Sequence, residues 1–535
     1  MSIPVLTVAR SVFLPTDPAV GQLLGMTLPR YLANTAGLVL GVGVGVAIVG
    51  VGAAWLVTMC RFRGSRTLEW ALLLPMAMPA YLLAYTYADL LQFAGPVQTV
   101  LRGWFGWTRG AYWFPDIRSL GGAIVVMSAV LYPYVYLLTR AAFLEQSAST
   151  HEASRVLGYG AARSFARVAV PIARPAIVGG VALALMEALA DFGTVKHFEV
   201  DTFTTAIYLS WFGLGSPVGA AQLAAGLLTF VFAILLGERV TRGNRRFYGA
   251  GGAAGAPRPI SPYRLGGARA IGALLFCVTP ILVGFAIPAG VLLRFAILQG
   301  DAGLGAQFGR LVANSLLLAM GAGVVAVVVA TVVAYGVRLA PTALMRGAAW
   351  ISTLGYAVPG SIVAVGILLP FGWLDNTVDA WARRSFGVST GLLLSGTVFA
   401  LLFAYLVRFL AISFNAVEAG LGRITPSMDV AARTLGERPF GVLRRVHLPL
   451  LRGSMLTATL LVFVDALKEL PATILIRPFN LDTLAIRVYQ LASDERLAQA
   501  STAALAIVAV GVVPVVVLSV AIARSRPAVP EATDI

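Results

Sequence analysis

Long apolar segments are the feature that most constrains the fold of this 535-residue chain. Within lipid, only helices and closed barrels satisfy their own backbone hydrogen bonds, and a helix needs about 20 apolar residues to cross the bilayer. We therefore expect an all-α polytopic membrane protein with about 11 transmembrane helices. They are predicted at 33–59, 70–93, 119–145, 176–196, 218–237, 270–296, 311–337, 347–370, 389–415, 453–476 and 500–523.

The composition agrees with an integral membrane protein. Hydrophobic residues make up 58% of the chain and charged residues only 12%, and the mean hydropathy is +0.84. In a soluble chain the formal net charge of +16 would suggest a nucleic-acid partner. In a membrane chain it is better explained by basic cytoplasmic loops, so we expect membrane lipid around the protein and no nucleic acid.

The two halves of the sequence are a tandem repeat. Matching residues occur in the same order at separations of 280 or 278 positions, which makes coincidence a poor explanation. The pairs are Asn34 and Asn314, Trp70 and Trp350, Pro79 and Pro359, Gly158 and Gly436, and Pro171 and Pro449.

The repeat divides the chain into two permease-like domains. We place a first transmembrane domain at 1–246, a Gly/Ala/Pro-rich linker at 247–268 and a second transmembrane domain at 269–535. Both copies face the same way, so the repeats are parallel, with 5 + 6 spans. Residue 1 aligns with about 281, so we expect the first helix of the first repeat to be missing or to start upstream.

Two polar loops, 152–171 and 430–449, share one plan. A cluster of small residues is followed by a glycine, and an aliphatic-proline pair then precedes a long apolar segment. We expect a short helix that the glycine ends and a span that the proline begins. Two such loops on a pseudo-symmetric body suit a dimeric soluble partner.

The arginines predict the orientation. By alternation, one side of the membrane carries most of them, and that side is cytoplasmic by the positive-inside rule. It holds the segments 57–69, 146–175, 238–269, 338–348 and 417–452 and the C-terminus. Both loops are therefore expected in the cytoplasm, with the N-terminus outside.

At these loops the sequence resembles the permeases of ABC importers, whose cytoplasmic loop runs Glu-Ala-Ala, three residues, Gly, nine residues, Ile, one residue, Leu-Pro. The resemblance implies that this chain lies in the inner membrane of a bacterium. It also implies that the two loops are coupling helices for a dimer of separate ATPase subunits. The second loop has Val430 at the leading acid, with Asp429 beside it. The matching positions are Glu152, Ala153, Ser154, Gly158 and Pro171 in the first loop and Ala431, Ala432, Gly436 and Pro449 in the second.

More of the chain is similar to the fused, two-copy permeases of ferric-iron importers. The similar segments are 188–208, 465–480 and 482–500. Fused permeases for thiamine, phosphonate or polyamine share this architecture and remain alternatives. The family also implies a periplasmic or lipoprotein substrate-binding protein, which the outer loops 197–217 and 477–498 could receive. In the second of these, Ser493-Asp494-Glu495-Arg496 is either a contact or simply a solvated turn.

No catalytic or cofactor site is expected in this chain. Its only lysines, Lys196 and Lys468, lack the glycine-rich context of a phosphate-binding loop, so ATP and Mg²⁺ are expected on the partner ATPase. The three histidines have no metal-ligand spacing, and Cys60 and Cys277 suggest neither a disulfide nor a metal site. We expect no stable metal site.

Acids follow both loops at matching positions, Glu187 and Asp191 in the first half and Asp465 and Glu469 in the second. Four-residue spacing places each pair on one helix face, and carboxylates within a membrane are expected to face its interior or water. Our hypothesis is that they line a pathway for a hard cation, which prefers oxygen ligands. The alternative is local pairing, as between Asp465 and Lys468.

Arg140 and Arg408 lie late in their predicted spans, and we expect them to reach the cytoplasmic interface. A competing class is an ion-coupled secondary transporter, which can also contain parallel repeats. A channel or membrane scaffold is a third possibility. The paired cytoplasmic loops favour the ATP-driven importer, since neither alternative needs docking helices.

Overall fold

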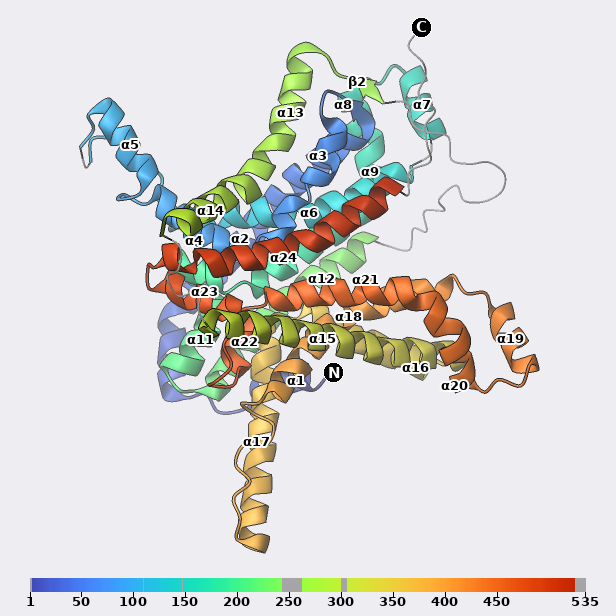
Figure 1. The fold of residues 1–535 in the computed structure, drawn as a ribbon. Coiled ribbons are helices and arrows are strands. Elements are labelled where there is room, and N and C mark those ends of the chain that lie inside the picture. Colours follow the sequence, from blue (N-terminus) through green and yellow to red (C-terminus); the bar gives the residue numbers. More distant parts are fainter. Residues whose placement is uncertain (1, 109, 147, 243–261, 300–305, 525–535) are drawn as a thin grey trace.

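The computed structural model describes residues 2–108, 110–146, 148–242, 262–299 and 306–524, and these are almost entirely helical (Figure 1). The first half contains α1 (Ile3–Ser11), α2 (Pro18–Met59), β1 (Cys60–Arg61), α3 (Ser65–Ala71), η1 (Leu74–Ala77), α4 (Ala80–Leu91), α5 (Pro96–Phe105), α6 (Leu120–Leu144), α7 (Ala148–Val156), α8 (Ala161–Ser164), η2 (Phe165–Ala169), α9 (Val170–Ala190), α10 (Gly193–His197), α11 (Phe203–Tyr208), η3 (Leu209–Gly213) and α12 (Pro217–Arg242).

The second half contains β2 (Tyr263–Arg264), α13 (Gly267–Ile281), η4 (Leu282–Ala286), α14 (Ile287–Gln299), α15 (Ala306–Leu339), α16 (Ala343–Thr353), η5 (Leu354–Ala357), α17 (Gly360–Phe386), α18 (Val398–Gly422), α19 (Pro426–Thr434), α20 (Pro439–Val442), η6 (Leu443–His447), α21 (Leu448–Leu467), α22 (Pro471–Ile476), α23 (Leu484–Ser493) and α24 (Leu497–Arg524). In this half, the elements from α15 onward follow much the same order as those from α2 onward in the first half.

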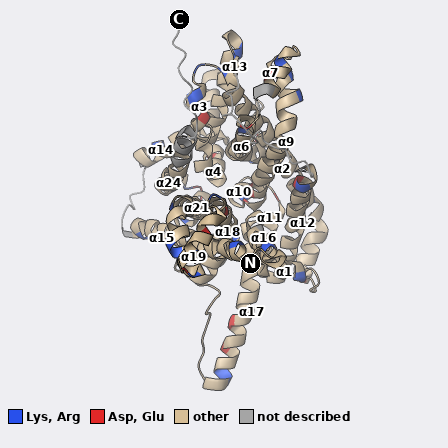
Figure 2. Cartoon of the chain, turned by 90° about the vertical axis from the view of Figure 1, so that its right-hand side faces the viewer, with Lys and Arg blue, Asp and Glu red and all other residues tan. Residues whose placement is uncertain are grey.

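Within the described ranges, ten helices are long and apolar enough to cross a membrane, or eleven if one bent pair counts as a span. The bent pair, Ser65–Ala77 and Ala80–Phe105, turns by 89°. This agrees with the expected all-α protein of about eleven spans. In Figure 2 the charged residues lie mostly at helix ends, and the body of the bundle is largely free of them.

The tandem repeat is visible in matching hydrogen bonds. Asn34 donates a side-chain hydrogen bond to the carbonyl of Asp201 (2.9 Å), and Asn314 does the same to Asp482 (3.2 Å). Each asparagine thus ties the first long helix of its half to the loop before α11 or α23. The matched sequence pair therefore marks a structural anchor in each half.

The first helix of each half packs partly against the other half. The second half's α14 packs against α24 of its own half and α4 of the first half, whereas α1 packs against α12 and α17 in the corresponding arrangement. Among the described residues no helix long enough to cross a membrane precedes α2, as expected for the first repeat. A short helix, α1, occupies the place that α14 takes in the other half.

Several predicted spans have different bounds in the structure, and two in the second half show why. The segment 347–370 is divided between α16 and α17, because Pro359 has an extended backbone and begins a new helix, as Pro79 does in the first half. The span predicted at 389–415 begins only at Val398.

The residues before α18 fold back onto α17 instead of crossing the membrane. The buried carboxylate of Asp375 accepts hydrogen bonds from the backbone N–H groups of Leu393, Leu394 and Ser395 (3.2, 3.0 and 2.7 Å) and from the Ser395 hydroxyl. The apolar composition of this segment could not distinguish such a strap from the start of a span.

The end of the predicted linker is attached to the first half. Residues 243–261 of the linker region lie outside the described residues. Beyond them, Cys60 and Arg61 pair in a parallel two-stranded ladder with Tyr263 and Arg264, and α13 begins at Gly267. The segment just before the second domain is therefore anchored next to α2.

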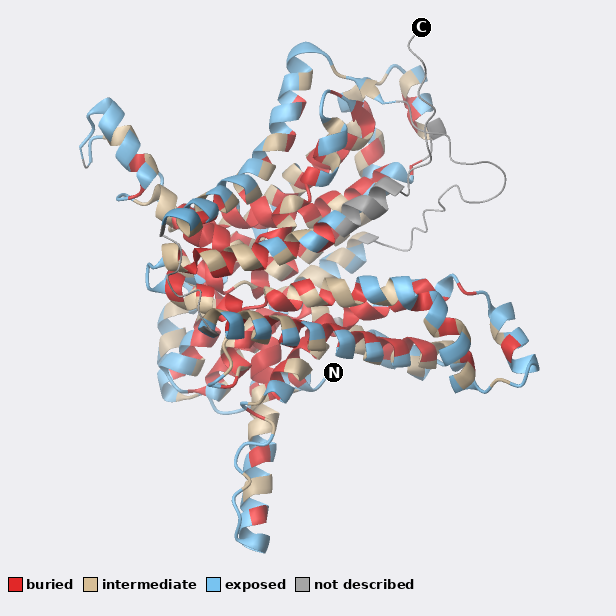
Figure 3. Cartoon of the chain, viewed as in Figure 1, coloured by how far each residue is buried: buried red, intermediate tan, exposed pale blue. Residues whose placement is uncertain are grey.

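Buried side chains concentrate in the middle of the bundle, and the outer faces are apolar but exposed (Figure 3). On α2, Leu40, Val44 and Ile48 are 69%, 59% and 60% exposed. Their four-residue spacing gives one apolar face, as expected for a helix surface in contact with lipid.

Candidate functional site

The two predicted coupling loops form the same structure. Their short helices, α7 and α19, each end in a glycine with a left-handed backbone, at φ +79° for Gly158 and +88° for Gly436. The glycine N–H bonds the carbonyl three residues back (2.9 and 3.0 Å), and the next N–H bonds the carbonyl five residues back (3.0 and 3.1 Å). This is a Schellman ending, which favours glycine because it has no Cβ.

The prolines of the two loops do not begin the following spans, as the sequence suggested. Those spans start about ten residues earlier, at Ala161 and Pro439. Pro171 and Pro449 lie directly after π-helical turns, η2 and η6. A proline lacks the N–H of a regular helical turn, and a π-turn changes the local hydrogen-bonding pattern so that the helix continues.

The second loop is held by its acid. Arg338 Nε donates to Asp429 Oδ2 (2.8 Å), and the guanidinium also donates to the carbonyls of Leu421 and Ile424 (2.7 and 2.9 Å). His447 Nε2 lies 2.8 Å from Asp429 Oδ1. Burial tends to raise the pKa of Asp429, but the hydrogen bond and charge of Arg338 outweigh it and lower that pKa below its usual value.

The first loop is held at the corresponding position by a histidine. His151 is buried and lies 2.8 Å from the Gln146 side chain, while the Ser154 hydroxyl donates to the His151 carbonyl (2.7 Å). Burial, and secondarily the charge of Arg155, lowers the pKa of His151. Glu152, in contrast, is exposed.

The predicted loop residues therefore divide into two groups. Ser154, Asp429 and Ala432 face the protein. Exposed positions, which are free to meet a partner, include Glu152, Ala153, Gly158, Pro171, Val430, Ala431, Gly436 and Pro449. Large apolar side chains lie among them: Leu157 is 72% exposed and Leu435 85%. Figure 1 shows α7 and α19 toward the same end of the molecule, away from α11 and α23.

The four acids occupy different positions from those predicted. Each helix ends before its second acid, so the two acids of a pair do not share one helix face. Asp191 follows α9 and accepts from the N–H of Thr194 (2.7 Å), which caps α10. Glu469 follows α21 and accepts from the N–H groups of Ala472 and Thr473 (both 3.0 Å), which caps α22.

The structure nevertheless brings all four acids to one cavity between the halves. Its volume is about 90 Å³, and Arg408 and Lys468 also line it. Arg408 Nη1 lies 3.0 Å from Glu469 Oε1, and Nη2 lies 3.6 Å from Glu187 Oε2. Lys468 Nζ lies 2.9 Å from Asp465 Oδ1, so the local pairing considered from the sequence does occur.

Arg140 and Arg408 do not extend their side chains into solvent, although this was expected for arginines that reach the cytoplasmic interface. Both are buried, 5% and 7% exposed, and both are paired with carboxylates. Arg140 pairs with Glu69 within the first half. Arg408 joins acids of both halves, which makes it a central part of the cavity that the sequence alone did not reveal.

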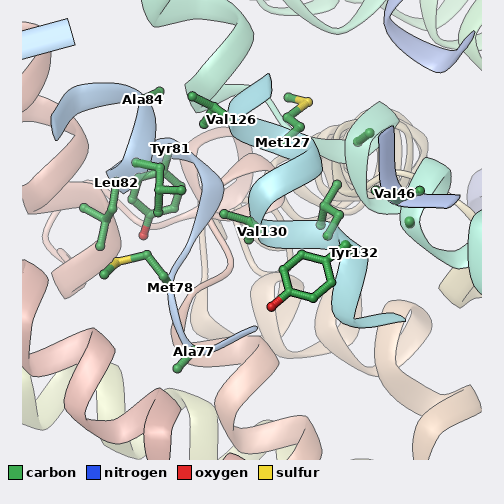
Figure 4. Packing of buried hydrophobic residues seen from close by; sticks show 14 of the residues in the cluster. Val46, Ala77, Met78, Tyr81, Leu82, Ala84, Val126, Met127, Val130 and Tyr132 are labelled. Carbon is green, nitrogen blue, oxygen red and sulfur yellow. The ribbon is translucent and has the colours of Figure 1, made fainter. Parts of the chain in front are cut away.

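The cavity also has an apolar and aromatic wall. Figure 4 shows Met78, Tyr81, Met127 and Val130, all of which line it. Tyr81 is only 4% exposed, and its hydroxyl has no hydrogen-bond partner among the described residues. A second cavity of about 220 Å³ shares Tyr134 and Asp465 with the first. No group of three or more His, Cys, Asp or Glu in the described part is arranged to hold a metal ion.

On the side of α11 and α23, one arginine connects the two halves. Arg118 lies 4.0 Å from Glu199 and 3.6 Å from Glu495, and both glutamates are 77% exposed. Both also have left-handed backbones, at φ 55° and 59°. Glu495 belongs to the cluster that was considered as a binding-protein contact, and in this structure it contacts Arg118.

Two membrane repeats around a charged cavity, with a matched pair of loops at one end, define a transport subunit. Residues 36–242, in the first half of the chain, match the permease family described as "Binding-protein-dependent transport system inner membrane component". Its members are multi-pass transport subunits, not enzymes, and work with an ATPase and a substrate-binding protein in ABC importers. The family predicted from the sequence is confirmed.

Three relatives differ in how much of the chain they match. The "Fe(3+)-transport system permease protein FbpB 2" of Haemophilus influenzae is 26% identical over 498 residues, 92% of this chain and 90% of that protein. The "Molybdenum transport system permease protein ModB" of Escherichia coli K12 is 27% identical over 203 residues, 37% of this chain and 86% of that protein. The "Putative 2-aminoethylphosphonate transport system permease protein PhnV" of Salmonella typhimurium is 31% identical over 165 residues, which are 30% of this chain and 56% of that protein. The near full-length match to the first fits a fused, two-copy permease.

Proposed function

We propose that this chain is the fused permease subunit of an ABC importer for ferric iron, driven by a separate ATPase dimer at α7 and α19. The observation that carries the proposal is the pair of loops with the same Schellman ending at matching positions. Each offers exposed apolar side chains on a helix that is tied to the membrane body by buried polar contacts. Such a helix transmits displacement, because it moves with the spans to which it is fixed.

The proposed orientation places α7, α19 and the C-terminus in the cytoplasm. The loop and helix ends on that side carry most of the arginines, including Arg423, Arg433, Arg438, Arg444 and Arg445 near α19. A substrate-binding protein would then dock on the opposite side, over the outer loops that contain Glu199 and Glu495. ATP and Mg²⁺ would be used by the partner ATPase.

A cationic cargo is favoured by the charges of the cavity. Four carboxylates and two basic side chains line it, which leaves a formal excess of acid, and carboxylate oxygens suit a hard trivalent cation. The relative that matches 92% of the chain is named for ferric transport. A 2-aminoethylphosphonate cargo, named for a relative that matches 30%, carries an anionic phosphonate that this lining disfavours.

The position of the cavity between the two halves supports a role in alternating access. Glu187 and Asp191 come from the first half, and Asp465 and Glu469 from the second, so relative movement of the halves changes their separation. We propose that these acids line the translocation pathway near the pseudo-twofold axis. Thiamine and polyamines are also cations, so charge alone does not separate them from iron.

The test is reconstitution of the permease with its ATPase and binding protein in proteoliposomes. ATP-dependent uptake of ferric iron, together with ferric-iron binding by the partner binding protein, supports the proposal. A binding protein that selects thiamine or a polyamine would replace the cargo but keep the class. Uptake driven by a proton gradient without the ATPase would overturn the class itself.

A further inference from the structure

Arg408 is the charged side chain that connects the two halves inside the cavity. It lies on α18, its side chain is 8% exposed, and its guanidinium is shared between Glu469 of its own half (3.0 Å) and Glu187 of the other (3.6 Å). A guanidinium remains charged at any physiological pH. The cavity therefore contains a fixed cation between the carboxylates proposed for the pathway.

The two carboxylates are held very differently. Glu469 is 1% exposed and also accepts hydrogen bonds from Ala472, Thr473 and the Thr473 hydroxyl (3.0, 3.0 and 2.7 Å). Glu187 is 26% exposed, and its contact with Arg408 is longer than a hydrogen bond. Glu469 thus holds the arginine in place, whereas Glu187 is the carboxylate that can be released.

The first half has no equivalent of this arrangement. The positions that correspond to Arg408 and Lys468 are Val130 and Ala190, so both cations of the cavity come from the second half. Gly360 also differs between the halves, and it leaves room for Arg408 and Glu469. A Cβ there would lie 2.4 Å from Arg408 Nη1 and 2.6 Å from Glu469 Oε1, and the first half has Ala80 at this position.

We propose that Arg408 is a tethered counter-cation: its guanidinium neutralises the Glu187/Glu469 pair between transport events and gives up Glu187 when a multivalent cation enters. This rests on the proposed function, because it assumes a cationic cargo. The buried Tyr81 hydroxyl, which lines the same cavity and has no hydrogen-bond partner among the described residues, offers a further oxygen to such a cation. Arg408 would thereby set the charge that a cargo must carry.

The proposal predicts that removal of the guanidinium creates a cation site in the resting permease. Tb³⁺ is a suitable probe, because it is a hard trivalent cation and its luminescence is sensitised by nearby tyrosines, here Tyr81 and Tyr134. In the purified permease, without ATPase or binding protein, Arg408→Gln should bind Tb³⁺ at least about tenfold more tightly than wild type. Arg408→Lys, which keeps the charge, should resemble wild type.

Two controls separate this site from unspecific binding. Arg408→Gln combined with Glu187→Gln should lose the added sensitised luminescence. Arg140→Gln also removes a buried arginine from a carboxylate, Glu69, but neither of these residues lines the cavity, so it should not gain affinity. If Arg408→Gln is not monodisperse, Arg408→Gln/Glu469→Gln is compared with and without Glu187→Gln.

The proposal is wrong if a folded Arg408→Gln variant binds Tb³⁺ no more tightly than wild type, or if the added binding survives Glu187→Gln. The proposal is also wrong if Arg408→Gln/Glu469→Gln binds Tb³⁺ equally well with and without Glu187→Gln. None of these outcomes depends on ATP, so failure here is distinct from failure of ATP-driven uptake, which tests the proposed function.

Discussion

Replacing Gly360 with alanine is the most direct way to disturb the charged cavity without removing a charge. The new Cβ would lie 2.4 Å from Arg408 Nη1, 2.6 Å from Glu469 Oε1 and 3.2 Å from the backbone nitrogen of Ala472. The two side-chain ends can move, but both are buried, so movement separates them from each other. The ion pair, rather than the backbone, should absorb the substitution.

Breaking a buried ion pair costs on the order of 3 kcal/mol. With about 2.1 cal/mol/K of unfolding entropy per residue, that loss corresponds to a fall in melting temperature of about 3 °C for a chain of this length. The assay is thermal unfolding of the purified permease in detergent, followed by intrinsic fluorescence, at matched protein concentration.

Two comparisons make the result specific. Ala80→Gly changes the corresponding position of the first half, where no arginine is opposite, and should cost less than about 1 kcal/mol. Gly360→Ala should have a smaller effect in an Arg408→Gln background, because the closer of its two side-chain clash partners is gone and the ion pair is already broken. Full additivity of the two changes, or an unchanged melting temperature for Gly360→Ala alone, would refute this reasoning.

Three further predictions concern the loops and the repeat. Gly158→Pro and Gly436→Pro should each weaken binding of the ATPase subunit in a pull-down, because proline cannot adopt the positive φ or donate the Schellman hydrogen bond; intact binding by both would exclude coupling helices. The lowered pKa of Asp429 means that its contribution is present above the ordinary carboxyl pKa and is lost as the pH falls through the lower folded value. Resistance of α19 to proteolysis should thus be constant from about pH 8 to 5 and should fall below about pH 4. Arg338→Gln should abolish this resistance at pH 7. A loss of resistance in the wild type already near pH 6 would contradict the prediction. Asn34→Ala and Asn314→Ala should each lower the free energy of unfolding by about 1 kcal/mol, and the two losses should add in the double variant. Clearly unequal losses for the two single variants would contradict equivalent anchors.

The sequence predicted those parts of the fold that depend on local pattern and on repetition. Apolar length was enough for most spans, and the glycine spacing was enough for the endings of α7 and α19, because a left-handed residue after a short helix is a local requirement. The match between Asn34 and Asn314 was visible without knowledge of its role. The structure shows that role to be the anchoring of equivalent loops.

The charged cavity could not be predicted in the same way, because its contacts are long-range and its helices end unexpectedly. The span predicted at 389–415 placed Arg408 near a membrane surface, whereas the helix runs from Val398 to Gly422 and places it well inside. The apolar runs likewise gave no sign that α9 and α21 stop before Asp191 and Glu469. Capping of the next short helix fixes those acids, and this requires the tertiary structure.

The central claim is that α7 and α19 couple this permease to a separate ATPase. It is tested most directly by uptake of radiolabelled ferric iron into proteoliposomes that contain the permease, the ATPase and the binding protein. We predict uptake that requires ATP and that is abolished when both Gly158 and Gly436 are changed to proline, although the double variant still inserts into the membrane. Uptake by the permease alone, driven by a proton gradient and unaffected by the two substitutions, would contradict the claim.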